Sequence, residues 1–120
     1  MKRTALLVED EPLLRWDLAQ FVGSLGFDVI DSGSGPDAIS HLDRAAEIDV
    51  LITDIDLGGL ITGSDVAEAF NAVSPKLRII FTSGRERRPS CLQGTSLFLP
   101  KPLRFDLLAS VLCDGLAPAA

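Results

Sequence analysis

Residues 5–12 read Ala-Leu-Leu-Val-Glu-Asp-Glu-Pro, and this stretch decides the predicted fold. The short apolar run is typical of a buried strand that ends where the acidic residues begin. Pro12 then stands where a helix can start, because the first helical turn does not need the N–H that proline lacks. A strand that passes at once into a helix indicates a βα unit in a parallel sheet.

Three further apolar runs follow the same pattern, and a polar residue comes directly after each. These pairs are 50–53 with Asp54, 78–81 with Thr82 and 97–100 with Lys101. Parallel strands end at a common edge, where open α/β sheets bind their ligands. We therefore expect these polar side chains to gather with Glu9 and Asp10 around one point.

Between the runs, apolar residues recur at helical spacing. The first helix is expected to end before Gly26, a residue type that commonly follows helices. The second opens at residues 34–37, Ser64 caps the third, and the last follows Pro102. The buried face of the third helix is expected to comprise Val66, Ala69, Phe70 and Val73.

The alternation of runs and helices predicts an α/β protein with a doubly wound (βα)₅ arrangement. Residues 27–30 alternate more than the other runs, which suits a strand near the edge of the sheet. The right-handed crossover rule leaves few topologies, and we expect a five-stranded parallel sheet with strand order 2-1-3-4-5. That order makes the first and third strands neighbours.

Length and composition predict one domain. The chain has 120 residues and an apolar fraction of 47%, which is enough for a packed core. We expect a single unit over residues 1–120, with a core over about residues 4–113 and a frayed tail at 116–120.

Charge and cysteine usage narrow the function classes. A net charge of −6 argues against nucleic-acid binding, since no strong basic field offsets phosphates. No apolar run is long enough to span a bilayer and no signal peptide is recognisable, so we expect a cytoplasmic protein without membrane contact. Cys91 and Cys113 lack CxxC spacing, which disfavours a redox or zinc role.

The expected cluster comprises three carboxylates, one hydroxyl and one ammonium. Clustered carboxylates repel one another and favour a hard cation such as Mg²⁺. The hydroxyl and the ammonium would suit a phosphoryl group carried by one of the carboxylates. The pattern therefore indicates a chemical switch.

The motifs together resemble the receiver domain of two-component response regulators. Residues 7–12, 52–56, 81–84 and 101–102 match its signature positions in order, and the resemblance extends from residue 5 to about 112. It implies a flavodoxin-like fold and a phosphoprotein of phosphorelay signal transduction. It also implies a cis peptide bond between Lys101 and Pro102.

The resemblance implies a role for each site residue. Asp54 would be the phosphoacceptor, forming an aspartyl phosphate. Asp10 and Asp54 would bind Mg²⁺, or alternatively Mn²⁺, while Glu9 would act through water and Asp56 through its backbone carbonyl. The residues implied to bind the phosphoryl group or to switch with it are Lys101, Thr82, Ser83 and Phe98.

Two stretches depart from the family pattern. The loop after Asp54 has Gly58 where the family usually has proline. The segment from Thr82 to Lys101 is about three residues shorter than in chemotaxis-type members and contains Pro89. We therefore expect a shortened or irregular fourth helix.

The implied partner is a histidine kinase or a histidine phosphotransfer protein, which would dock on the first helix and the loop after the fifth strand. Leu13, Trp16 and Leu103 are the candidate contacts, with Trp16 facing outward. No effector is expected after Ala120, so output would pass through contact with an unknown downstream protein. We expect a monomer or weak dimer that catalyses its own phosphorylation and dephosphorylation without turning over a separate substrate.

Two alternatives remain open. Asp54 and Asp56 resemble the nucleophile and the acid–base residue of haloacid-dehalogenase-type phosphohydrolases. That family places its nucleophile on the first strand, however, and Glu9 and Asp10 would stay unexplained. The other alternative is a receiver-like binding module that acts independently of phosphate.

Overall fold

The computed structural model describes residues 2–84 and 96–115. Its elements in chain order are β1 (Thr4–Val8), α1 (Pro12–Ser24), β2 (Asp28–Ser32), α2 (Gly35–Ile39), the 3₁₀ helix η1 (Leu42–Glu47), β3 (Val50–Asp54), α3 (Gly63–Val73), β4 (Arg78–Ser83), β5 (Ser96–Pro100) and α4 (Phe105–Gly115). Three predictions lie outside the described residues. They concern the irregular helix expected between β4 and β5, Cys91, and the frayed tail expected at residues 116–120.

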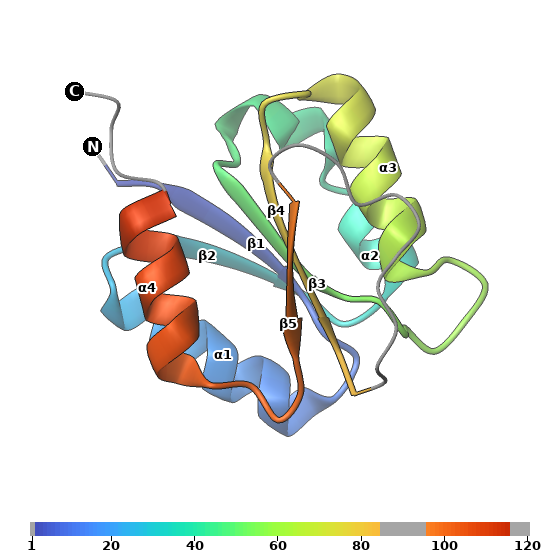
Figure 1. The fold of residues 1–120 in the computed structure, drawn as a ribbon. Helices are drawn as coiled ribbons and strands as arrows, with labels where there is room; N and C mark the ends of the chain where they lie inside the picture. Colours follow the sequence, from blue (N-terminus) through green and yellow to red (C-terminus); the bar gives the residue numbers. More distant parts are fainter. Residues whose placement is uncertain (1, 85–95, 116–120) are drawn as a thin grey trace.

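The five strands form one parallel sheet in the order β2-β1-β3-β4-β5, which confirms the predicted topology. Helices α1 and α4 cover one face of this sheet, and α2 and α3 cover the other (Figure 1). In the register of β3 and β4, Asp54 stands opposite Thr82. The sheet thus brings the ends of separate apolar runs to one edge.

Side chains of β1 enter two hydrophobic cores. Leu6 and Val8 pack in the core under α2 and α3, whereas Ala5 and Leu7 pack in the core under α1 and α4. A parallel strand covered on both faces is buried at every position, which explains the uninterrupted apolar run of the sequence. Strand β2 lies at the edge of the sheet as predicted, and its Asp28 and Asp31 are exposed.

Helix α1 follows the sequence prediction closely. Pro12 is its first residue, and Leu18 and Val22 are fully buried against the sheet. Gly26 adopts a φ of 101°, the left-handed conformation that glycine tolerates and that commonly ends a helix. The chain then turns directly into β2.

The predicted start and inner face of α3 are wrong in two places. Thr62, not Ser64, caps the helix: its hydroxyl accepts a hydrogen bond from the Asp65 N–H while the Asp65 carboxylate accepts one from the Thr62 N–H. This reciprocal pair satisfies two otherwise unpaired backbone donors. Val73 is 59% exposed because it is the last helical residue, and Ala67 is buried in the core.

Candidate functional site

Three carboxylates meet at the carboxyl edge of the sheet. Glu9 and Asp10 follow β1, and Asp54 ends the neighbouring strand β3. Each offers one oxygen, and these oxygens all lie within 4.8 Å of one another. Glu9 and Asp54 are 1% and 5% exposed, whereas Asp10 faces solvent. Mutual repulsion and burial make this cluster costly without cations.

Lys101 supplies one positive charge within the cluster. Its Nζ lies 2.9 Å from Glu9 Oε1 and 3.1 Å from Asp54 Oδ2, so a single ammonium bridges two buried carboxylates. The backbone N–H of Lys101 donates to the Ser83 carbonyl at 2.8 Å, which ties the residue to the end of β4. The Lys101–Pro102 peptide is cis, as the family resemblance implies.

The charges at this edge perturb one another. Burial raises the pKa of the Glu9 carboxyl, and the hydrogen bond from Lys101 only partly opposes that rise. Burial also acts to lower the pKa of the Lys101 ammonium. Hydrogen bonds to Glu9 and Asp54 outweigh it, so the Lys101 pKa lies above its ordinary value. Lys101 therefore stays charged throughout the neutral range.

The backbone around Asp54 is fixed from two sides. The Ile55 N–H donates to the Thr82 carbonyl on β4 at 2.9 Å, and the Gly63 N–H donates to the Ile55 carbonyl at the same distance. A Cβ atom on Gly63 would lie 1.9 Å from the Asp54 carbonyl oxygen. Only glycine lets the start of α3 approach the backbone of Asp54 so closely.

The loop after β3 contacts the acidic cluster in two ways that the sequence did not indicate. The Gly58 N–H donates to Asp10 Oδ2 at 3.0 Å, at the position where the family usually has proline. The Asp56 N–H donates to Asp54 Oδ1 at 3.1 Å. Proline has no N–H, so it could not make the Gly58 contact.

The remaining predicted site residues lie close by on β4 and β5. Thr82 is buried beside Asp54, and the Ser83 hydroxyl donates to Asp56 Oδ2 at 3.2 Å. Phe98 is half-buried and packs against the core under α2 and α3. The structure therefore brings Ser83 and Asp56 together through their side chains, whereas the resemblance to receiver domains implied only a backbone role for Asp56.

The donor set suits a divalent cation. The three clustered side chains offer only carboxylate oxygens, which are the ligands that Mg²⁺ and Mn²⁺ prefer. The neighbouring ammonium makes the same edge attractive to a phosphoryl group. The arrangement can thus hold a cation and an anion side by side.

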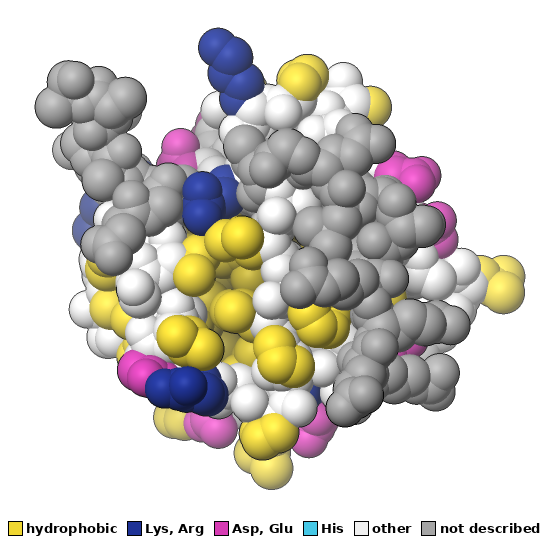
Figure 2. Space-filling model, viewed as in Figure 1, with side chains coloured by type: hydrophobic (Ala, Val, Ile, Leu, Met, Phe, Trp, Pro, Cys, Tyr) yellow, Lys and Arg dark blue, Asp and Glu magenta, His cyan; other side chains and the backbone are white. Residues whose placement is uncertain are grey.

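A hollow of about 670 Å³ adjoins the cluster between α1 and the residues that follow β5. Its lining comprises Glu11, Leu13, Leu14, Asp17, Lys101, Pro102, Leu103 and Phe105. Leu13 is 79% exposed and Trp16 62% exposed, so both face outward. Trp16 is not among the lining residues. Further hydrophobic side chains gather between α4 and β5 (Figure 2).

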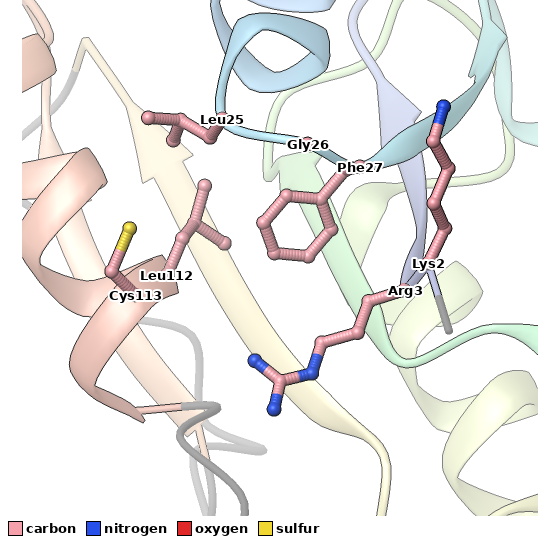
Figure 3. Close-up of a pocket in the computed structure, with 7 residues that line it drawn as sticks. All are labelled: Lys2, Arg3, Leu25, Gly26, Phe27, Leu112 and Cys113. Atoms are coloured by element: carbon pink, nitrogen blue, oxygen red, sulfur yellow. The ribbon is translucent and has the colours of Figure 1, made fainter.

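A second hollow, of about 370 Å³, lies at the opposite edge of the sheet. It opens between the end of α1, the starts of β1 and β2, and α4, and Figure 3 shows the Phe27 ring pointing into it. Its charged lining residues are the cations Lys2 and Arg3. None of the described residues that line this hollow carries a carboxylate, so they offer no cation ligand of the kind found at the carboxyl edge.

The family model for the response regulator receiver domain matches residues 5–112. The chain belongs to this family. It is 27% identical over 118 residues to the sensor kinase CckA of Brucella abortus, and 32% identical over 117 residues to the positive alginate biosynthesis regulatory protein of Pseudomonas aeruginosa. Each match covers 94% of this chain.

The receiver fold is shared with solved structures. A response regulator receiver protein from Sinorhizobium medicae superimposes with a TM-score of 0.82 at 28% identity, covering 94% of this chain and 93% of that one. The chain spans only 12% of the CckA kinase and 47% of the alginate regulator, so these curated relatives are much longer. Among the described residues, no helix has the length and apolar character needed to cross a membrane.

Proposed function

We propose that this receiver domain accepts a phosphoryl group on Asp54 from the phosphohistidine of a histidine kinase or phosphotransfer protein. The P–N bond to the imidazole breaks, a P–O bond to a carboxylate oxygen of Asp54 forms, and the imidazole leaves with a proton. One observation carries the proposal: the Lys101 ammonium lies within hydrogen-bond distance of both Glu9 and Asp54 inside a carboxylate cluster.

The chemistry explains why this charge arrangement is useful. An anionic carboxylate must approach an anionic phosphate, so the repulsion has to be offset at the moment of transfer. Glu9, Asp10 and Asp54 would hold Mg²⁺, with the Asp56 backbone carbonyl as a further ligand. When bound, the cation neutralises charge on the phosphoryl oxygens.

Lys101 would complete the site from the opposite side. As a flexible point charge, it can exchange its contact with Asp54 for an oxygen of the new phosphoryl group. Thr82, opposite Asp54 on β4, would donate a hydrogen bond from its hydroxyl to the same group. Ser83 and Phe98 would shift position in response to that contact. Such a rearrangement would bias a two-state element of the fold.

Residues 1–120 are proposed to act as one receiver unit that signals through protein contacts and turns over no separate substrate. Relatives named as a sensor kinase and as a regulatory protein support a place in two-component signalling. The hollow beside the cluster supports docking there of the phosphodonor protein, with Leu13 and Leu103 of its lining and the exposed Trp16 of α1 as proposed contacts.

The proposal is tested by incubating the protein with Mg²⁺ and acetyl phosphate and measuring the intact mass. We expect one phosphoryl adduct, which should not form with EDTA present or in Asp54→Ala. It should still form in the control Asp28→Ala, whose side chain is exposed at the start of the edge strand β2. Release of inorganic phosphate from phosphomonoesters without an adduct would instead support the phosphohydrolase. Absence of both signals, with an intact phosphohistidine donor also failing, would support a phosphate-independent module.

A further inference from the structure

Every polar group of Glu9 has a hydrogen-bond partner. Its carboxylate accepts from Lys101 and from the Glu11 N–H, at 2.9 and 3.1 Å. Its backbone N–H donates to the Ser32 carbonyl at 3.0 Å. Its backbone carbonyl accepts from Arg15 Nη1 at 2.9 Å. Arg15, which the function proposed above does not use, thus holds the peptide that joins Glu9 to Asp10.

Two residues at and just after the end of β2, Asp31 and Gly33, lie against the Arg15 side chain. Arg15 Nε lies 3.5 Å from Asp31 Oδ2, and the Arg15 side chain is only 26% exposed. A Cβ atom on Gly33 would lie 2.7 Å from Arg15 Nη1 and 3.3 Å from Cζ. The φ of Gly33 is not positive, so the backbone there does not require glycine. The missing side chain instead leaves room for the guanidinium.

We propose that Arg15 is a positioning residue for cation binding: it fixes the plane of the Glu9–Asp10 peptide and thereby the direction in which the Asp10 carboxylate leaves the backbone. Within the described residues, the single hydrogen bond to the Asp10 side chain comes from Gly58. An exposed carboxylate with one contact depends on its backbone for its orientation. The inference rests on the proposed Mg²⁺ site.

Electrostatics alone predicts the opposite result, which makes the test sharp. Removing a positive charge near a cation site should strengthen cation binding, although the pairing with Asp31 and screening by salt keep that effect small. Loss of positioning should weaken it, because groups that orient metal ligands contribute about 10- to 100-fold in metal affinity. The sign of the change therefore separates the two explanations.

The experiment measures the dissociation constant of Mg²⁺ by calorimetry on the unphosphorylated protein and four variants: Arg15→Ala, Gly33→Ala, the double variant of the two, and a control. We expect Arg15→Ala to weaken binding by about tenfold, the low end of the range for such groups because Arg15 acts through the backbone. Gly33→Ala keeps the charge but displaces the guanidinium, so it should weaken binding in the wild type. It should have no effect in the Arg15→Ala background, where nothing remains to displace.

Arg44→Ala is the matched control, since Arg44 pairs with Glu47 on η1, away from the cluster. Unfolding curves of all variants without Mg²⁺ check that each is folded. Unchanged or tighter binding by Arg15→Ala, or an equal effect of Gly33→Ala with and without Arg15, would overturn the inference while leaving the proposed function intact. No Mg²⁺ binding by the wild type would refute both.

Discussion

Lysine meets aspartate at both edges of the sheet, and the two contacts differ in burial. At the amino edge, Lys2 Nζ lies 3.6 Å from Asp28, and the side chains are 68% and 61% exposed. At the carboxyl edge, Lys101 Nζ lies 3.1 Å from Asp54, and the side chains are 19% and 6% exposed. The same two residue types thus form a solvated pair at one edge and a desolvated network at the other.

The difference in burial between the two pairs indicates which charged groups are kept for a reason other than stability. An exposed pair contributes little and costs little, because water already solvates both groups. Buried charges cost several kcal/mol each and are tolerated when paired, which is common at functional sites. Among the described residues, Glu9 and Asp54 at the carboxyl edge are the buried charged residues, so the desolvation cost is concentrated there.

Replacing Lys101 and replacing Lys2 should give the largest difference in the free energy of unfolding between the two edges. Lys101→Met leaves Glu9 and Asp54 buried without their counter-charge, so the free energy of unfolding at pH 7 should fall by about 3–5 kcal/mol. Lys2→Met should change it by less than about 0.5 kcal/mol. Urea unfolding followed by circular dichroism measures both. Equal losses for the two variants would remove the distinction between the edges.

Glycine substitutions test the packing at the two edges. Gly63→Ala forces a Cβ against the Asp54 carbonyl and should cost about 2–3 kcal/mol, the upper part of the range for overpacking. Gly23, near the end of α1, has open space around it, and Gly23→Ala should stabilise by about 0.5–1 kcal/mol. Thermal and urea unfolding compare them. A tolerated Gly63→Ala would show that α3 can move away from Asp54.

Mg²⁺ should stabilise the protein through the carboxyl edge alone. At ten times its dissociation constant, the ion should raise the free energy of unfolding by about 1.4 kcal/mol. Asp10→Asn should abolish this increment, and it should also stabilise the metal-free protein by reducing repulsion in the cluster. Asp28→Asn at the amino edge should leave the increment unchanged. A loss of the increment in Asp28→Asn would place cation binding elsewhere.

The smallest expected effect is a pH dependence that belongs to Lys101. Its folded-state pKa is raised above the ordinary 10.5, so its contribution is complete below pH 10.5 and is lost as the pH rises through the folded-state value. Stability of the wild type should therefore fall more steeply above pH 10.5 than that of Lys101→Met, by at most about 1.4 kcal/mol per pH unit. Equal slopes above pH 10.5 for the wild type and Lys101→Met, measured by urea unfolding at a series of pH values, would contradict this prediction.

Much of the fold could be predicted because burial on both faces leaves a clear record in the sequence. The run at residues 5–8 is apolar throughout since β1 contacts two cores, and the polar residues after each run mark the common edge. The start of α3 was harder, because Thr62 and Ser64 are both good caps. Asp65, three residues after Thr62, was the deciding signal.

Parts of the site left no such record. The contact of Arg15 with the Glu9 carbonyl joins a long side chain to a backbone group, and backbone groups are the same in every residue. The exposed position of Val73 depends on where α3 ends, which periodicity does not fix within a turn. The roles of Asp54 and its neighbours remain predictions, supported by the geometry.

The most direct test of the account is to locate the phosphoryl group after treatment with Mg²⁺ and acetyl phosphate. Borohydride reduces an aspartyl phosphate to homoserine, and peptide mass spectrometry then identifies the modified position. We predict homoserine at position 54 alone. Homoserine at position 10 or 56 with unmodified Asp54, or no homoserine in a protein that carries the adduct, would contradict the assignment of Asp54 as the phosphoacceptor.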